Sequence, residues 1–142
     1  MITVYESIAR FWLTPLLATI EPTHTVIEIE NIPDFAQFNN AGLFSSPNDI
    51  HTQMLGGQVK HIEFKSFYLR RGFRDNAARQ NNEAFMEALR AKIYDMNMNY
   101  DLPVDGREWV SIQINGGIYP SFRHENLSFA DYLVPLRLEY IL

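Results

Sequence analysis

The sequence contains no cysteine, which excludes disulfide bonds, thiol catalysis and cysteine-ligated zinc. It also lacks an excess of positive charge: the formal net charge is −5, which argues against nucleic-acid binding through a broad cationic surface. No apolar run approaches the roughly 20 residues of a membrane-spanning helix. Because Met1–Ile20 has neither the basic start nor the cleavage site of a signal peptide, we expect a soluble protein that is not exported.

Sequence signatures of catalysis and cofactor binding are also missing. The histidines include no pair at the i, i+4 spacing of a metal-binding helix. Neither Gly56–Gly57 nor Gly116–Gly117 is followed by the lysine and hydroxyl of a phosphate-binding loop, so each pair favours a hairpin or a flexible loop. No G-x-S-x-G motif is present. We therefore expect no cofactor, no metal site and no enzymatic activity.

Asp101 and Asp105 form the carboxylate pair that comes nearest to a catalytic pattern. Two carboxylates in different environments can act as acid and base. However, Pro103 and Gly106 accompany them, and this combination is typical of a turn. Turn geometry is therefore the favoured interpretation, with acid–base catalysis as the alternative.

What the chain does have is a rich supply of aromatic residues, with 10 Phe, 7 Tyr and 2 Trp among 142 residues. Aromatic side chains furnish both a core and adhesive surface patches. The length is typical of a single domain, and this composition argues against disorder. We therefore expect one folded domain over residues 1–142.

Two helices are predicted from apolar residues that recur every three or four positions. The first follows Thr3, a suitable cap, and Pro15 predicts that it ends or kinks near Leu13. The second is long and begins after Asp75, another capping residue. The predicted core stripes are Val4, Ile8, Phe11, Trp12, Leu16 and Ile20 in the first helix, and Ala78, Phe85, Leu89, Ile93 and Met96 in the second.

The most regular strand signal is the alternation of apolar residues along 130–142. At about 3.3 Å per residue this strand would reach about 40 Å, so it is either the spine of a sheet or extends past its own domain. Pro135 cannot donate to a strand ladder, which predicts an edge position or a bulge. The other predicted strands are Thr25–Glu30, Val59–Phe73 with a bulge near Lys65, and Val110–Ile114 with Val110 and Ile114 on the same face as Ile112.

The range from about 35 to 57 is rich in Asn, Ser, Gly and Pro and predicts a long loop. A loop of this length inside a compact domain is uncommon, and it indicates a working loop, a mobile segment or undetected short strands. The short connection between the last two strands predicts that they pair antiparallel. The expected fold class is α+β: a mainly antiparallel sheet with the N-terminal helix and one long central helix packed on it.

The single local cluster of basic residues is Arg70, Arg71 and Arg74, at the exit of the predicted strand Val59–Phe73. Arginine is favoured at interfaces because its planar guanidinium donates several hydrogen bonds and stacks well. The cluster predicts either a surface for an acidic partner or an ordinary solvated strand end.

From about Gln58 to Leu142 the chain resembles the tail terminator and minor capsid proteins of long-tailed phages and prophages of Gram-positive bacteria. The resemblance depends on the succession of elements, since each motif alone is common. They are the strand FKSFYLRRGFRDN, the helix NNEAFMEALRAKIYDM, the turn and strand LPVDGREWVSIQINGGIYPS, and the closing ADYLVPLRLEYIL.

The resemblance implies a structural virion protein that closes the finished tail tube as a homo-oligomeric ring, a hexamer, and helps to join the tail to the head. Its implied partners are copies of itself, the major tail tube protein and the connector or stopper protein. It implies no membrane and no specific nucleic-acid binding, and a ring of this kind leaves room for DNA to pass through it. The implied location is the tail or neck of the virion, assembled in the cytoplasm of the host bacterium.

No catalytic residue is carried over from this family. The interface candidates are Phe44 and Met54 in the long loop, the arginines Arg70, Arg71 and Arg74, and Pro135. Two alternatives stay open. One is a head-completion or neck component of the same head-tail joint, and the other is a small α+β ligand-binding protein or enzyme with an aromatic pocket.

Overall fold

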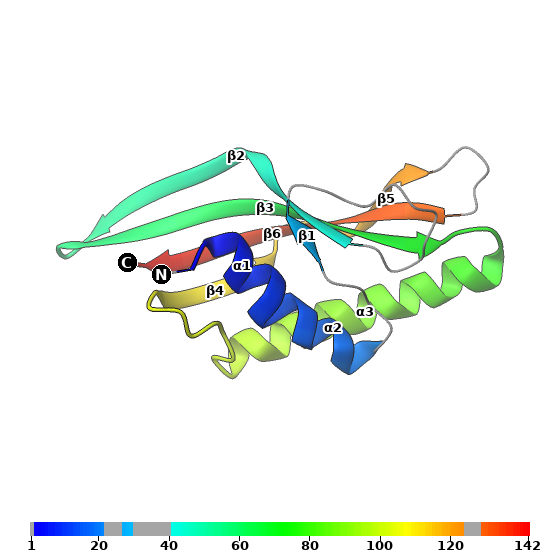
Figure 1. The fold of residues 1–142 in the computed structure, drawn as a ribbon, viewed down its shortest axis with the longest axis horizontal. Helices are drawn as coiled ribbons and strands as arrows, with labels where there is room; N and C mark the ends of the chain where they lie inside the picture. The colour runs from blue at the N-terminus through cyan, green and yellow to red at the C-terminus, as the bar shows by residue number, and fades with distance from the viewer. Residues whose placement is uncertain (1, 22–26, 30–40, 124–128) are drawn as a thin grey trace.

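The computed structural model describes residues 2–21, 27–29, 41–123 and 129–142, without the side chains of 28, 29 and 46–55. The fold is α+β in one small domain, as the sequence predicts (Figure 1). In chain order the elements are α1 (Val4–Ile8), the π-helical turn η1 (Ala9–Leu13), α2 (Thr14–Ile20), β1 (Glu28–Ile29), β2 (Ala41–Leu55), β3 (Gln58–Gly72), α3 (Asn76–Met98), β4 (Glu108–Ile114), β5 (Tyr119–Arg123) and β6 (Phe129–Ile141).

The N-terminal helix begins at the predicted cap, where Thr3 Oγ1 accepts the backbone N–H of Glu6 at 3.1 Å. Of the two predicted outcomes near Leu13, an end or a kink, the end is wrong, because the chain continues through the π-helical turn η1 into α2. In the wider π turn the backbone N–H of Thr14, just before Pro15, donates to the Ala9 carbonyl five residues back, and Thr14 Oγ1 donates to the same carbonyl at 2.6 Å. This turn also moves Phe11 out of the predicted core stripe, and its side chain is 62% exposed.

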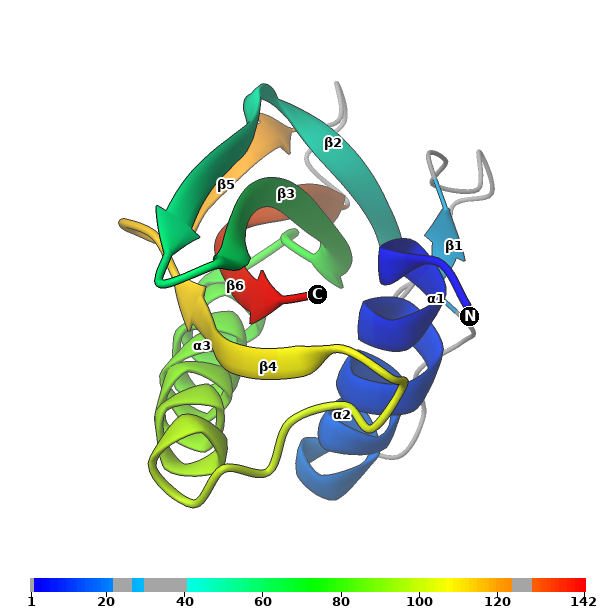
Figure 2. The ribbon, with the colours of Figure 1, turned by 90° about the vertical axis from the view of Figure 1, so that its left-hand side faces the viewer.

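Helix α3 follows its prediction closely. The carboxylate of Asp75 caps it by accepting the backbone N–H of Ala78 at 2.8 Å. Its buried stripe contains four of the five predicted residues, and Asn82 and Met86 join them. Figure 2 shows the N-terminal helix and α3 side by side beneath the curved sheet, so both helices cover the same face.

Over the described ranges the sheet has six strands in the order β1-β2-β3-β6-β4, with β5 also paired to β6. All pairs are antiparallel except β1 with β2. β6 is the spine that its length predicts, since it pairs with β3 along one edge and with β4 and then β5 along the other.

The edge position predicted from Pro135 is therefore wrong. Pro135 lies in the middle of β6, opposite the break between the end of β4 at Ile114 and the start of β5 at Tyr119. Its carbonyl accepts the N–H of Asn115 at 2.8 Å. In an antiparallel strand the N–H and C=O of one residue point to the same neighbour, so the missing donor faces this break, where no strand needs it.

The long-loop prediction is wrong for Ala41–Leu55, which forms β2 and pairs with β3. Residues 35–40 lie outside the described residues. The two strands meet at Gly56 and Gly57, both with positive φ (56° and 89°), as a tight hairpin requires. Figure 1 shows this hairpin extending past the N-terminal helix and past the end of β6. Of the predicted strand Thr25–Glu30, the structure describes β1 as Glu28–Ile29.

The sequence predicts a bulge in β3 near Lys65, but the irregularity lies in β2, the strand that pairs with this part of β3. β3 pairs with β6 without interruption from Lys60 to Gly72, whereas β2 shifts register between Ser45 and Ile50. A second irregularity in β4 places Val110 outside the ladder, so that Trp109 and Ile112 are both buried and Val110 is 40% exposed. The prediction that Val110 shares the inner face with Ile112 is therefore wrong.

The core lies between the helices and the inner face of the sheet. From β3 and β6 it takes alternate residues such as Phe67, Leu69, Val134 and Leu138, all fully buried. On the opposite, outer face of the sheet no helix lies among the described residues (Figure 1). Among the described residues no helix has the length and apolar character to span a bilayer.

Candidate assembly surface

The predicted basic cluster is not one exposed surface. Arg70 is 4% exposed, and its guanidinium donates to both carboxylate oxygens of Asp131, at 2.7 and 3.1 Å. The guanidinium also lies over the Phe129 ring at 4.9 Å. The pairing is possible because Arg70 and Asp131 face each other across β3 and β6. Arg70 therefore joins two strands of its own protomer.

Arg71 is buried on the inner face of the sheet. It bonds Asn82 Oδ1 of α3 at 3.0 Å and Glu21 Oε2 after α2 at 2.7 Å, and it lies over the Phe85 ring at 4.2 Å. It thereby ties the two helices to β3. The solvated strand end predicted for the cluster is wrong for Arg70 and Arg71, because both side chains have partners within the protomer, whereas Arg74 is exposed.

The other predicted interface residues are spread over the sheet. Phe44 is half-buried in β2, edge-to-face with the Tyr68 ring at 5.4 Å between centroids. Pro135 is half-buried in β6. The backbone of Met54 lies near the tip of the β2–β3 hairpin, and its side chain is outside the described residues. These positions within one protomer do not show whether the residues contact a partner.

Phe44, Tyr68 and Pro135 share the outer face of the sheet, because the strand register places them on the side away from the helices. Charged residues occupy the same face, including Glu139, which pairs with Lys60 at 3.0 Å and with Arg137 at 2.5 Å. The outer face is thus a mixed apolar and charged surface. At its margin, β5 carries Tyr119 and Phe122, 51% and 57% exposed.

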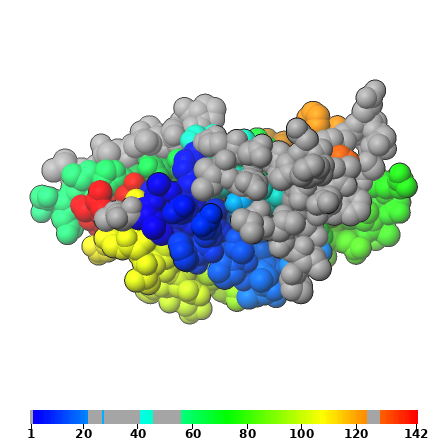
Figure 3. Space-filling model, viewed as in Figure 1, coloured from blue at the N-terminus to red at the C-terminus, as the bar shows by residue number. Residues whose placement is uncertain are grey.

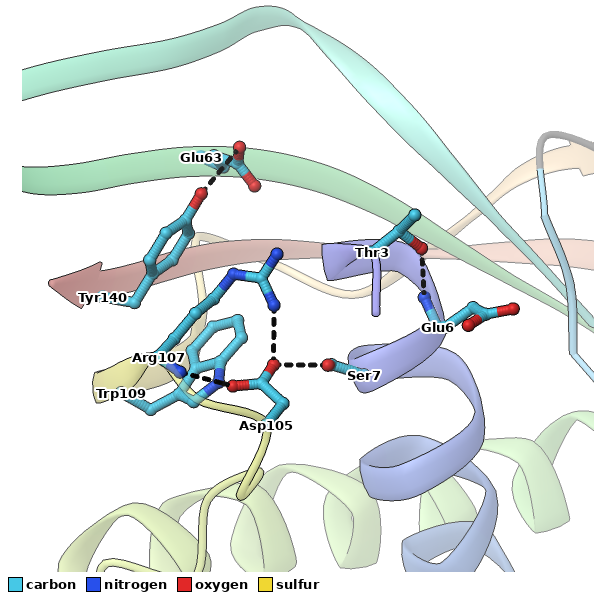
Figure 4. Close-up of polar contacts among 8 residues, drawn as sticks. All are labelled: Thr3, Glu6, Ser7, Glu63, Asp105, Arg107, Trp109 and Tyr140. Atoms are coloured by element: carbon cyan, nitrogen blue, oxygen red, sulfur yellow. Dashed lines mark hydrogen bonds and ion pairs between the residues drawn. The ribbon is translucent and has the colours of Figure 1, made fainter. Parts of the chain in front are cut away.

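Asp105 is the centre of a polar cluster where α1 meets β4 (Figure 4). Its carboxylate accepts hydrogen bonds from Ser7 Oγ, from Trp109 Nε1 at 3.0 Å, and from Arg107 through the backbone N–H at 3.0 Å and Nη1 at 2.9 Å. Burial alone would raise the pKa of this carboxyl, but the four hydrogen bonds outweigh it and hold the pKa below its usual value. The charged carboxylate therefore anchors the turn after α3 to the N-terminal helix.

A second polar pair lies beside this cluster. Tyr140 donates to Glu63 Oε1 at 3.2 Å, and burial together with the Glu63 charge raises the pKa of the tyrosine hydroxyl. Two buried atoms, Glu63 Oε2 and Arg107 Nε, have no hydrogen-bond partner in the described structure. Asp105 thus has the turn role favoured from the sequence, and Asp101 stands apart, exposed, with its carbonyl accepting Trp12 Nε1 at 2.9 Å.

Two apolar grooves flank the C-terminal half of α3. The first, here the α2 groove, lies between the N-terminal helix and the loop that joins α3 to β4. The second, here the β4 groove, lies between α3 and β4. The α2 groove includes Phe11, Pro15, Lys92, Met96, Asp101 and Val104; the β4 groove includes Arg90, Tyr94, Asn97, Met98, Gln113 and Ile114.

The exposed apolar side chains at these grooves were missed by sequence reasoning. Val104 is fully exposed, and Tyr94 and Met98 are 65% and 62% exposed. A signal was present for the last two, since they are four residues apart and lie off the predicted core stripe of α3. Val104 stands in a turn between Pro103 and Asp105, where an apolar side chain has no core to enter.

Among the described residues no group of histidine, aspartate and glutamate side chains is arranged to hold a metal ion. No protein-family model matches the sequence, and no curated protein matches it. A chain in the structure described as "Virion of native gene transfer agent (GTA) particle" is similar in fold. It has a TM-score of 0.53 and 13% sequence identity, and the match covers 89% of this chain and 84% of that one. At this identity the likeness concerns the fold alone.

Proposed function

We propose that this chain is a structural virion protein, and specifically a tail terminator that forms a homo-oligomeric ring at the end of a tail tube. The observation that carries the proposal is the fold likeness to a chain of a gene transfer agent virion over nearly the full length of both chains. Agreement over whole chains supports a comparable kind of subunit, whereas a shared local motif would not. The sequence resemblance to tail terminators supplies the finer part of the proposal.

The mechanism is binding without a chemical step. A ring of terminators occupies the exposed surface of the last tube subunits, which stops further growth, and presents a different surface to the connector. The structure supports this role by leaving large apolar side chains at the surface, including Phe11, Tyr94 and Val104. Apolar surface of this kind is typical of protein contact sites.

The test is the assembly state of the full chain. Native mass spectrometry and negative-stain microscopy over a range of protein concentrations should show closed rings. The tail tube protein of the same particle should bind one end of these rings and stop elongating. A chain that stays monomeric at high concentration, with tube protein added, would contradict the proposal. Rings that bind the connector protein but not the tube would instead indicate a neck component.

A further inference from the structure

The α2 groove and the β4 groove lie on opposite flanks of the same helix. Lys92 and Met96 line the first, and Arg90, Tyr94 and Met98 line the second. Residues four apart stack on one stripe of a helix. The two stripes are out of step by two residues, which corresponds to about 200° around the helix axis. A single protomer therefore presents two different apolar sites that face away from each other.

Each groove exposes large apolar side chains on a fixed base. At the β4 groove, Asn97 is held to the sheet, since its Oδ1 accepts the N–H of Ile112 at 2.8 Å and its Nδ2 donates to the Ile112 carbonyl at 2.5 Å. At the α2 groove, Trp12 holds the loop after α3 through its bond to the Asp101 carbonyl at 2.9 Å. Figure 3 shows the N-terminal helix (blue) bordering the segment that follows α3 (yellow). Both sites are thus formed before any partner arrives.

Each groove carries a charged side chain that has capacity for a partner: Arg90 in the β4 groove, and Asp101 in the α2 groove beside Lys92. Arg90 in the β4 groove is exposed and makes one hydrogen bond in the described structure, to the Gly116 carbonyl at 3.2 Å. Asp101 in the α2 groove is exposed, and its carboxylate has no hydrogen bond or ion pair with any other described residue. A guanidinium and a carboxylate are well matched in geometry as well as charge.

We propose that the β4 groove of one protomer packs against the α2 groove of a second copy of this chain, with Arg90 of the first beside Asp101 of the second. This inference rests on the proposed function, because it names the contact between neighbours in the ring. Two different surfaces facing away from each other make a heterologous contact, and such contacts close into rings when the rotation between subunits allows it. Tyr94 and Met98 then pack against Phe11 and Val104, which removes four exposed apolar side chains from water.

The first test replaces one exposed valine inside the contact and, as a control, another exposed valine outside it. Val104→Arg alters a fully exposed side chain and leaves the protomer core intact. We expect it to raise the concentration for half-assembly by about tenfold or more, measured by native mass spectrometry. The matched control is Val110→Arg, an exposed position of β4 that belongs to neither groove, and it should assemble like the wild type.

The second test reverses the two charges. Arg90→Asp and Asp101→Arg should each weaken assembly, because like charges then face each other at every contact. An equimolar mixture of the two variants should form rings again, since alternating copies restore an opposite-charge pair at each contact. These mixed rings should contain equal numbers of the two variants at alternating positions. Asp95→Arg reverses an exposed charge outside both grooves and is the control; it should assemble like the wild type.

The outcomes separate this inference from the function beneath it. Rings that persist in Val104→Arg and in both charge variants overturn the groove contact and leave the proposed function standing. Intact rings that lose only tail tube binding also overturn it, and would assign the grooves to the tube protein. A wild-type chain that stays monomeric with tube protein present overturns both. Circular dichroism and thermal unfolding of each variant identify any loss that comes from misfolding.

Discussion

Asp105 offers the sharpest test of how the N-terminal helix is held to the sheet. Its side chain is 2% exposed and accepts four hydrogen bonds. Asp105→Ala leaves Arg107 without its ion-pair partner, and removing one member of a buried pair costs about 3–5 kcal/mol. For a chain of this size, about 3 °C of melting temperature corresponds to 1 kcal/mol, so we expect a decrease of about 10–15 °C. Differential scanning calorimetry and urea unfolding measure both values.

Asp105→Asn should lose roughly half as much. The backbone N–H of Arg107 and Trp109 Nε1 both bond Oδ1, which the amide retains. Ser7 and Arg107 Nη1 bond Oδ2, which becomes an amide nitrogen that cannot accept them. We expect a loss of about 1.5–2.5 kcal/mol. Asp95→Asn, an exposed carboxylate on α3, is the matched control and should change stability little.

The same variant predicts a pH dependence with a definite sign. Because folding lowers the pKa of Asp105, its stabilisation is fully present above the unfolded-state pKa, near 3.8, and is lost as the pH falls through the lower folded-state pKa. The stability difference between wild type and Asp105→Asn should be constant near neutral pH and should shrink below about pH 4. A difference that is the same at pH 7 and in acid, or an alanine variant no less stable than the asparagine variant, would refute the reasoning.

Three further predictions concern the sheet. Phe67→Ala removes a fully buried ring from β3 and should cost about 3–5 kcal/mol in urea unfolding, and a loss below about 1 kcal/mol would contradict its central place in the core. Arg70→Met should cost a similar amount because it removes the guanidinium that bonds both oxygens of the buried Asp131 carboxylate, whereas adding Asp131→Leu should recover most of the loss in a double-mutant cycle. Pro135→Ala should lower stability by less than about 1 kcal/mol, with the amide of Asn115 still protected from hydrogen exchange; a large loss would mean that the proline ring has a packing role.

The elements predicted correctly are those whose signals are local. Helix α3 has a capping Asp75 and an apolar stripe within one continuous segment, and β6 has its own regular alternation. β2 has neither. Its Asn, Ser, Pro and Gly residues are typical of a loop, and it becomes a strand because β3 offers a long paired edge. Strand formation depends on such neighbours more than on intrinsic preference.

The candidate site was harder to predict because burial depends on residues far apart in the chain. Arg70 is buried because Asp131 lies opposite it on β6, a pairing that only the strand register reveals. Phe11 is exposed because the π-helical turn before Pro15 shifts the helix face, although its spacing matches the core stripe. Neither fact is contained in the residues immediately around these positions.

In this protomer some charged side chains are buried and some apolar side chains are exposed, which is the reverse of the usual arrangement. This reversal bears on the proposed function. Arg70, Arg71 and Glu63 are buried and held by partners inside the fold, while Phe11 and Val104 are left in water. Buried ion pairs contribute little net stability but resist alternative arrangements, because each requires its own partner. Exposed apolar side chains on rigid bases stay in contact with water in the isolated chain, so their burial favours association. If the proposed ring forms, its energetic gain should therefore come from the grooves beside α3 and not from the arginines of β3.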